Sequence, residues 1–147
     1  MVADEQNIRD LRQWLCWRTE DQGGKPTKVP YSPLTSERAS STDPRTWAGY
    51  GEAVSARGEH DYHGIGFVFT PEDGLCGVDL DGCLDPQTGE IEGWAQEIIE
   101  ELSSYTEISP SGTGVHIIVK GKAPNKKRGK VEAYSLERFF AMTGQVL

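Results

Sequence analysis

Residues 64–83 contain two short β-rich runs, GIGFVFT and LCGVDLD, with the turn-forming residues PEDG between them. Runs of this length and composition predict two strands paired as an antiparallel hairpin. Four more short β-rich runs follow in the second half of the chain: SYTEI, VHIIVK, VEAYS and RFFAMTG. An apolar and aromatic run from Trp14 to Trp17 predicts a first strand near the N-terminus. Strands therefore outnumber helices in the predicted fold.

Two segments predict helices between these strands. In residues 41–58, Thr42 or Asp43 can cap a helix, Pro44 suits its first turn and Gly58 suits its end. Residues 92–103, EGWAQEIIEELS, have the spacing of an amphipathic helix. The side chains expected to face the core from these two helices are Trp47, Tyr50 and Val54, then Trp94, Ile98, Ile99 and Leu102.

Interspersed helices and strands predict an α+β fold, with one mainly antiparallel sheet covered by helices. The 147 residues suit a single domain spanning 1–147, and 36% hydrophobic with 26% charged residues is typical of a globular chain. No apolar run approaches the roughly 20 residues that span a bilayer. The first ten residues, MVADEQNIRD, are polar and acidic, unlike a secretory signal, so we expect a cytoplasmic protein without membrane contact.

Two acidic residues, Asp79 and Asp81, lie one residue apart in the run GVDLDGC. On a strand, residues i and i+2 project from the same face, while Val78 and Leu80 point to the other face and the core. A charge taken out of water must be paired, hydrogen-bonded or bound to a metal. The pair therefore indicates a site for one or two divalent ions, and the alternative is two exposed strand acids beside a turn.

Two further elements could complete such a site. The segment Ser109–Gly114 is a glycine-rich turn whose backbone N–H groups could converge on an anion, and it leads into a strand with His116 near its start. No Gly-Lys-Ser/Thr follows, so this is not a Walker loop. Glu132 lies in a later β-rich run and could supply a third carboxylate. Arg138 could contact phosphate, or it could pair with Glu137 or Glu132.

The segment 120–130, KGKAPNKKRGK, carries six cations and no acid, although the net charge of the chain is −8. The acidic total argues against a protein that coats nucleic acid indiscriminately. A solvated hairpin tip is the simpler interpretation of this run, and binding of template or primer phosphates is the functional one. The six cations are Lys120, Lys122, Lys126, Lys127, Arg128 and Lys130.

The order GVDLDG, then SPSGTGVH, then VEAYSLERFFAMTG resembles the catalytic domain of the archaeo-eukaryotic primase superfamily. The resemblance is strongest to the primase-polymerase domains of phages, plasmids and other mobile elements. WLCWR, GKPTKVPYSP and STDPRTW are similar to the opening of these domains, so the resemblance extends from about Trp14 to Gly144. It implies an RRM-like catalytic core and nucleotidyl transfer with two Mg²⁺ or Mn²⁺ ions.

Site residues follow from the resemblance, motif by motif. The implied metal ligands are Asp79, Asp81 and Glu132. The implied contacts to the phosphates of the incoming nucleotide are His116 and the turn residues Ser111, Gly112, Thr113 and Gly114. Weaker phosphate contacts are Arg138, Lys28 and Tyr31. The cationic segment joins the strand of His116 to that of Glu132, so its base is expected beside the site.

The resemblance also implies the partners of the reaction. These are a single-stranded DNA template with a primer, an NTP or dNTP, and a helicase domain or protein, because such domains often continue into a helicase. Two other functions stay open on the sequence alone. One is a metal-dependent nuclease or phosphoesterase that uses the same carboxylates, and the other is a non-catalytic RRM-like module that only binds nucleic acid.

Overall fold

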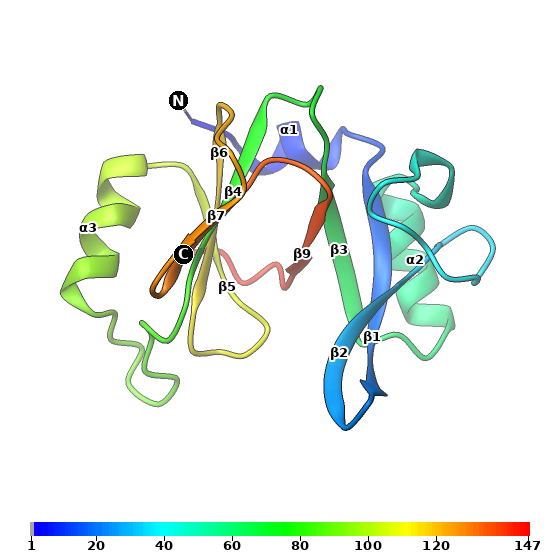
Figure 1. Cartoon of the computed structure of the whole chain (residues 1–147), viewed down its shortest axis with the longest axis horizontal. Helices are drawn as coiled ribbons and strands as arrows, with labels where there is room; N and C mark the ends of the chain where they lie inside the picture. The colour runs from blue at the N-terminus through cyan, green and yellow to red at the C-terminus, as the bar shows by residue number, and fades with distance from the viewer. Residues whose placement is uncertain (1) are drawn as a thin grey trace.

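The computed structural model describes residues 2–147 and contains two antiparallel sheets (Figure 1). The first sheet has the order β2-β1-β3-β9 and the second has the order β5-β6-β4-β8-β7. The first four strands are β1 (Trp14–Gln22), β2 (Lys25–Tyr31), β3 (Gly64–Phe69) and β4 (Leu75–Leu80). The others are β5 (Tyr105–Ile108), β6 (Val115–Lys120), β7 (Lys126–Arg128), β8 (Val131–Tyr134) and β9 (Arg138–Met142). The α-helices are α1 (Glu5–Arg9), α2 (Tyr50–Glu59) and α3 (Gly93–Leu102).

The α+β class with mainly antiparallel strands is confirmed, but the prediction of a single sheet is wrong. The predicted β3–β4 hairpin is also wrong: β3 pairs with β1 and β9, whereas β4 pairs with β6 and β8. The chain changes sheets at the PEDG turn because aromatic side chains pack over β4. A Cβ atom on Gly77 would lie 2.5 Å from ring atoms of both Phe69 and Phe140, so only glycine leaves room for these rings. The two sheets therefore meet through an apolar core rather than edge to edge.

The first sheet is covered by α2, which lies beside β1 in Figure 1. The predicted helix over residues 41–58 is split in two. Pro44–Thr46 forms a 3₁₀ turn capped by the Asp43 side chain, and α2 starts only at Tyr50. Ala53 and Ala56 face the core, whereas Val54 is 45% exposed, so its predicted burial is wrong.

The second sheet carries α3 on one face. Leu80, Val115 and Ile117 form a core there with Ala95, and the four side chains predicted to face inward from this helix pack against it. Along the chain these elements follow one another as β4, α3, β5, β6 and β8. In the sheet the four strands lie in the order β5-β6-β4-β8. This matches the expected RRM-like core, with β7 present where a βαββαβ unit has its second helix. The opposite face of the sheet is left for the first sheet and for the predicted site.

Within residues 2–147, no helix combines the length and the apolar character needed to cross a bilayer.

Candidate active site

The antiparallel register of the second sheet places three predicted site residues in one row. Asp79 on β4 lies directly opposite His116 on β6 and directly opposite Glu132 on β8. Residues opposite one another in antiparallel strands share a face, with Cβ atoms about 4.5–5.5 Å apart. Val78 and Leu80 belong to the face covered by α3, so this row lies on the other face. Three segments far apart in the sequence are thereby brought together.

A cavity of about 310 Å³ opens on this row. Both sheets contribute to it, through Lys28 from β2 and Arg138 to Ala141 from β9 as well as residues of the second sheet. Its other lining residues are Asp79, Asp81, Ser109, Pro110, Ser111, His116 and Tyr134. Two carboxylates, an imidazole, three hydroxyls and two cations therefore line one small space. This mixture suits an anionic ligand that arrives together with a metal cation.

Asp79 is the least compensated acid of the cavity. Its side chain is 28% exposed, and burial, followed by the charges of Asp81 and Glu132, raises its pKa to about 6. Among the described residues, the basic side-chain atom within 4 Å of its carboxylate is Nε2 of His116, at 3.6 Å. The carboxylate is still mostly ionised at pH 7. Lys127 and Lys28 offset part of this charge from a distance, but no lysine or arginine of the described residues pairs with it directly.

His116 is a neutral ring under the same conditions. Burial lowers the pKa of His116 to about 4, with a smaller contribution from the charge of Lys28, while the nearby Ala141 backbone opposes the shift. The ring stacks on Phe140 with centroids 4.2 Å apart. Within the described part of the chain, its buried Nδ1 atom has no hydrogen-bond partner. The contact with Asp79 is therefore not an ion pair at neutral pH, and Nε2 faces the carboxylate and the cavity.

Glu132 lies in the row, but its carboxylate is engaged elsewhere. It accepts a short hydrogen bond from the Tyr134 hydroxyl and pairs with Lys127 Nζ at 3.4 Å. The Tyr134 hydrogen bond is the main reason that the pKa of Glu132 is lowered. Across residues 2–147, no three His, Cys, Asp or Glu side chains are grouped closely enough to hold a metal ion. The expected three-carboxylate arrangement is not formed, and Asp79 and Asp81 share the cavity without Glu132.

Tyr134 was not recognised from the sequence, although a signal for it was present. It lies two residues after Glu132 on the same strand, so the period of two that pairs Asp79 with Asp81 also puts Tyr134 beside Glu132. Applying that period to β8 would have found a hydroxyl in hydrogen-bonding reach of the third carboxylate.

The glycine-rich turn packs on the end of β4, beside Asp81. A Cβ atom on Gly114 would lie 2.7 Å from the Leu80 carbonyl oxygen, and Gly112 has a φ of +76°. The expected set of free N–H groups is only partly present. The Gly112 N–H donates to the Ser109 carbonyl and the Thr113 N–H donates to the Ser111 hydroxyl, because the turn closes on itself. The turn lines the cavity through Ser109, Pro110 and Ser111 instead.

Of the weaker phosphate contacts, Lys28 and Arg138 line the cavity and Tyr31 does not. The guanidinium of Arg138 lies 5.3 Å from the centre of the Tyr134 ring. Tyr31 is buried, and its hydroxyl donates to Glu20 on the neighbouring strand β1. The predicted role of Tyr31 is therefore wrong, since its polar atom is used within the first sheet.

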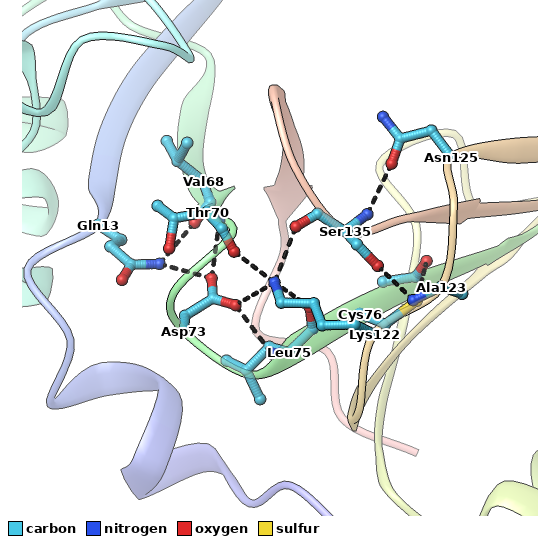
Figure 2. Close-up of polar contacts among 11 residues, drawn as sticks. Gln13, Val68, Thr70, Asp73, Leu75, Cys76, Lys122, Ala123, Asn125 and Ser135 are labelled. Carbon is cyan, nitrogen blue, oxygen red and sulfur yellow. Dashed lines mark hydrogen bonds and ion pairs between the residues drawn. The ribbon is translucent and has the colours of Figure 1, made fainter.

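The cationic segment lies beside the site, as its position in the chain suggested. Strand β7 pairs with β8, and the Asp81 N–H donates to the Lys130 carbonyl at 2.8 Å. All six cationic residues are exposed, and the Lys122 side chain keeps 32% of its surface accessible. The prediction for Lys122 is wrong, because its ammonium group is surrounded by oxygen atoms of the protein itself (Figure 2).

A larger cavity of about 610 Å³ lies at the other end of β9, where Met142 to Gly144 line it. Its wall includes Trp14, Tyr105 and the fully buried Glu107. The Glu107 carboxylate accepts from the Tyr105 hydroxyl at 2.8 Å and from the N–H groups of Thr143 and Gly144. That acid is thus satisfied internally. The smaller cavity is the candidate site, because it is the one lined by the carboxylate pair and His116.

Comparison with known proteins finds a phage relative of this chain. No protein-family model matches the chain. The chain is 38% identical over 142 residues to a DNA primase-polymerase of Nitratiruptor phage NrS-1. The match covers 91% of this chain but 19% of that protein, so the chain spans about a fifth of the length of its relative. The chain is therefore similar to one segment of a phage enzyme of the primase-polymerase type.

Proposed function

We propose that this chain is the catalytic part of a DNA primase-polymerase of the archaeo-eukaryotic type, acting in the replication of a mobile element. The reaction is template-dependent nucleotidyl transfer, in which a primer 3′-hydroxyl attacks the α-phosphate of a nucleoside triphosphate and pyrophosphate leaves. The observation that carries the proposal is the row in which Asp79 faces both His116 and Glu132 at a cavity shared with Asp81. The similarity to the phage primase-polymerase supports it.

The donor set fits Mg²⁺ or Mn²⁺. Magnesium is usually held by one or two carboxylates together with substrate phosphates, and not by a cage of protein atoms alone. Asp79 and Asp81 supply two such carboxylates, and no lysine or arginine of the described residues pairs directly with Asp79. Bound there, the ions would lower the pKa of the primer hydroxyl and offset the charge on the leaving pyrophosphate. Glu132 becomes a third ligand only if its carboxylate leaves Tyr134 and Lys127.

The remaining residues of the cavity position the triphosphate. Lys28 and Arg138 supply positive charge for phosphate oxygens, and the hydroxyls of Ser109 and Ser111 can donate hydrogen bonds to them. His116 is neutral at pH 7, so its N–H group donates without adding a charge. Because Phe140 stacks on the ring, the imidazole is already oriented before the nucleotide arrives.

Nucleic acid would lie along the second sheet beside this cavity. The exposed cations of 120–130 are suited to the phosphates of a single-stranded template and primer, with affinity that falls steeply as salt rises. A helicase acting on the same DNA is the partner we propose for unwinding.

Primer extension tests this proposal. The wild-type chain is incubated with a labelled primer, a template, dNTPs or NTPs, and Mn²⁺, and products are resolved by length. We expect extension that depends on the template and stops with EDTA. The double variant Asp79→Asn/Asp81→Asn should lose at least about a hundredfold in rate. Asp21→Asn is the matched control, because Asp21 is an exposed aspartate on strand β1.

The two alternative functions predict different results in the same assay. Shortening of the labelled strand without extension would indicate a metal-dependent nuclease or phosphoesterase. Retention of the DNA in a binding assay, with no change in its length under any metal, would indicate a module that only binds nucleic acid.

A further inference from the structure

Lys122 belongs to the cationic segment, but its ammonium group contacts oxygen atoms of the protein while its side chain stays 32% exposed. Its Nζ atom lies 2.7 Å from Asp73 Oδ1, 3.0 Å from the Leu75 carbonyl and 2.9 Å from the Ser135 carbonyl, and it also contacts the Thr70 carbonyl (Figure 2). These oxygens come from the β3–β4 turn, the start of β4 and the residue after β8. One ammonium group therefore joins three segments of the chain.

Asp73 holds this ammonium group in place. Its side chain is 0% exposed, and its carboxylate accepts hydrogen bonds from the backbone N–H groups of Thr70 and Leu75 and from the Gln13 side chain. A carboxylate removed from water needs this set of donors and a cation. Asp73 is thus fixed by the first sheet and the turn, and it fixes Lys122 in turn.

The residues after Lys122 hold the end of β8 by further hydrogen bonds. The Ala123 N–H donates to the buried Ser135 hydroxyl at 2.9 Å, and the Ser135 N–H donates to Asn125 Oδ1 at 2.8 Å. Asn125 Nδ2 also donates to the Leu136 carbonyl at 2.9 Å. Both partners of Ser135 are drawn in Figure 2. Residues 122–125 therefore hold the connection from β8 to β9 by hydrogen bonds to its backbone and to the Ser135 hydroxyl.

This connection joins the strand that carries Glu132 and Tyr134 to the strand that carries Arg138. Strand β8 has only four residues, and Glu132 lies three positions before Ser135. On the other side of the connection, Arg138 lies three positions after Ser135 and lines the cavity. With so few residues in the ladder, the position of Glu132 against Asp79 depends on how the end of β8 is held.

We infer that Asp73 and Lys122 form a positioning pair, which holds the β8–β9 connection against the start of β4 and so places Glu132 and Arg138 relative to Asp79. Neither residue touches the cavity, so their effect on the reaction is indirect. The kinetic part of this inference rests on the proposed nucleotidyl transfer. The structural part does not, because the position of β8 can be measured without activity.

The test compares Lys122→Met with Lys126→Met, an exposed cation of the same segment, and with Lys25→Met, an exposed lysine of β2. All are assayed at a temperature at which circular dichroism shows every variant folded. For Lys122→Met we expect kcat to fall about tenfold or more, while DNA affinity and its salt dependence stay within twofold of wild type. Lys126→Met should lower DNA affinity and its salt dependence, and Lys25→Met should change neither kcat nor DNA affinity.

Hydrogen–deuterium exchange supplies the readout that needs no activity. In Lys122→Met, peptides covering 131–140 should exchange at least about tenfold faster, while those of β5 and β6 stay protected. The double variant Asp73→Asn/Lys122→Met removes both charges of the pair, so it should fold if the single variant does not. The kcat of the double variant should be as low as that of Lys122→Met, because the β8–β9 connection still lacks its contact with the lysine.

Each outcome has a distinct meaning. An active wild type with unchanged kcat and unchanged exchange in folded Lys122→Met would overturn the inference, as would a full return of kcat in the double variant. A loss of DNA affinity in Lys122→Met equal to that in Lys126→Met would make Lys122 a phosphate contact instead. If the wild type shows no extension at all, the proposed function fails, and the exchange result alone decides the positioning role.

Discussion

Asp73 and Asp79 lie six residues apart, one in the turn before β4 and the other near the end of that strand, and their surroundings are opposite. Asp73 is fully buried, yet it is hydrogen-bonded to two backbone N–H groups and a glutamine and is paired with Lys122. Asp79 is more exposed, yet it faces two other carboxylates and a neutral imidazole. Burial alone therefore does not mark the functional acid. The acid that pairs directly with no lysine or arginine of the described residues is the one suited to bind a cation.

The largest expected effect is a loss of stability on replacing Asp73. Asp73→Asn leaves the Lys122 ammonium among carbonyl oxygens without its counter-charge, and breaking a buried pair in this way costs about 3–5 kcal/mol. Lys122 keeps partial access to water, so the lower end is expected. Urea unfolding at pH 7 measures the change. A loss below about 1 kcal/mol would show that the pair does not hold the turn.

For Asp79, the expected change in stability has the opposite sign. Asp79→Asn removes a half-buried charge from beside Asp81 and Glu132, so the metal-free protein should gain stability. Allowing for partial solvent screening, the gain at pH 7 is about 1–2 kcal/mol. Urea unfolding in EDTA measures it, with Asp21→Asn as the neutral control. Loss of stability in the variant would contradict the idea that this carboxylate is strained by its surroundings.

The stability gained in Asp79→Asn should depend on pH over a defined range. Because the pKa of Asp79 is raised to about 6, the folded state binds its proton more tightly than the unfolded state between about pH 4 and pH 6. Stability contributed by this group therefore falls as pH rises through that window. The difference between Asp79→Asn and wild type should be close to zero at pH 4 and reach its full value above about pH 6.5.

The lowered pKa of His116 changes the stability in the opposite direction over nearly the same pH range. Its pKa is lowered to about 4, so the unfolded state binds the proton more tightly and stability rises between about pH 4 and pH 6.5. In wild type the two slopes oppose each other. His116→Gln should therefore leave a protein whose stability falls with pH over this range. A wild-type profile that falls at least as steeply as that of the variant would show that the pKa of His116 is not lowered in the folded state.

The smallest change in stability is expected for Lys127, which lies beside Glu132. Lys127 is exposed and pairs with Glu132 at 3.4 Å, and an exposed pair of this kind contributes at most about 1 kcal/mol. Lys127→Gln should change unfolding within that limit and reduce the slope of log affinity for single-stranded DNA against log salt by about one. An unchanged slope would remove Lys127 from the DNA-binding surface.

Much of the local arrangement could be predicted from the sequence, because it depends on periodicity. A period of two puts Asp79 and Asp81 together, and a period of 3.6 gives α3 its buried face, which the structure confirms. Interspersed helices and strands were enough to expect an α+β fold, and the resemblance to the primase superfamily implied its RRM-like core. These features involve residues close together in the chain or patterns that belong to one element.

The partners of individual side chains were decided by the tertiary structure. The turn at PEDG looks like a hairpin in sequence, but Gly77 admits two aromatic rings that separate β3 and β4 into different sheets. Lys122 looks like its cationic neighbours, but four oxygens from distant segments surround its ammonium. Local sequence determines which way a side chain points along its own strand. It does not determine what distant group meets that side chain, because that depends on how the two sheets pack.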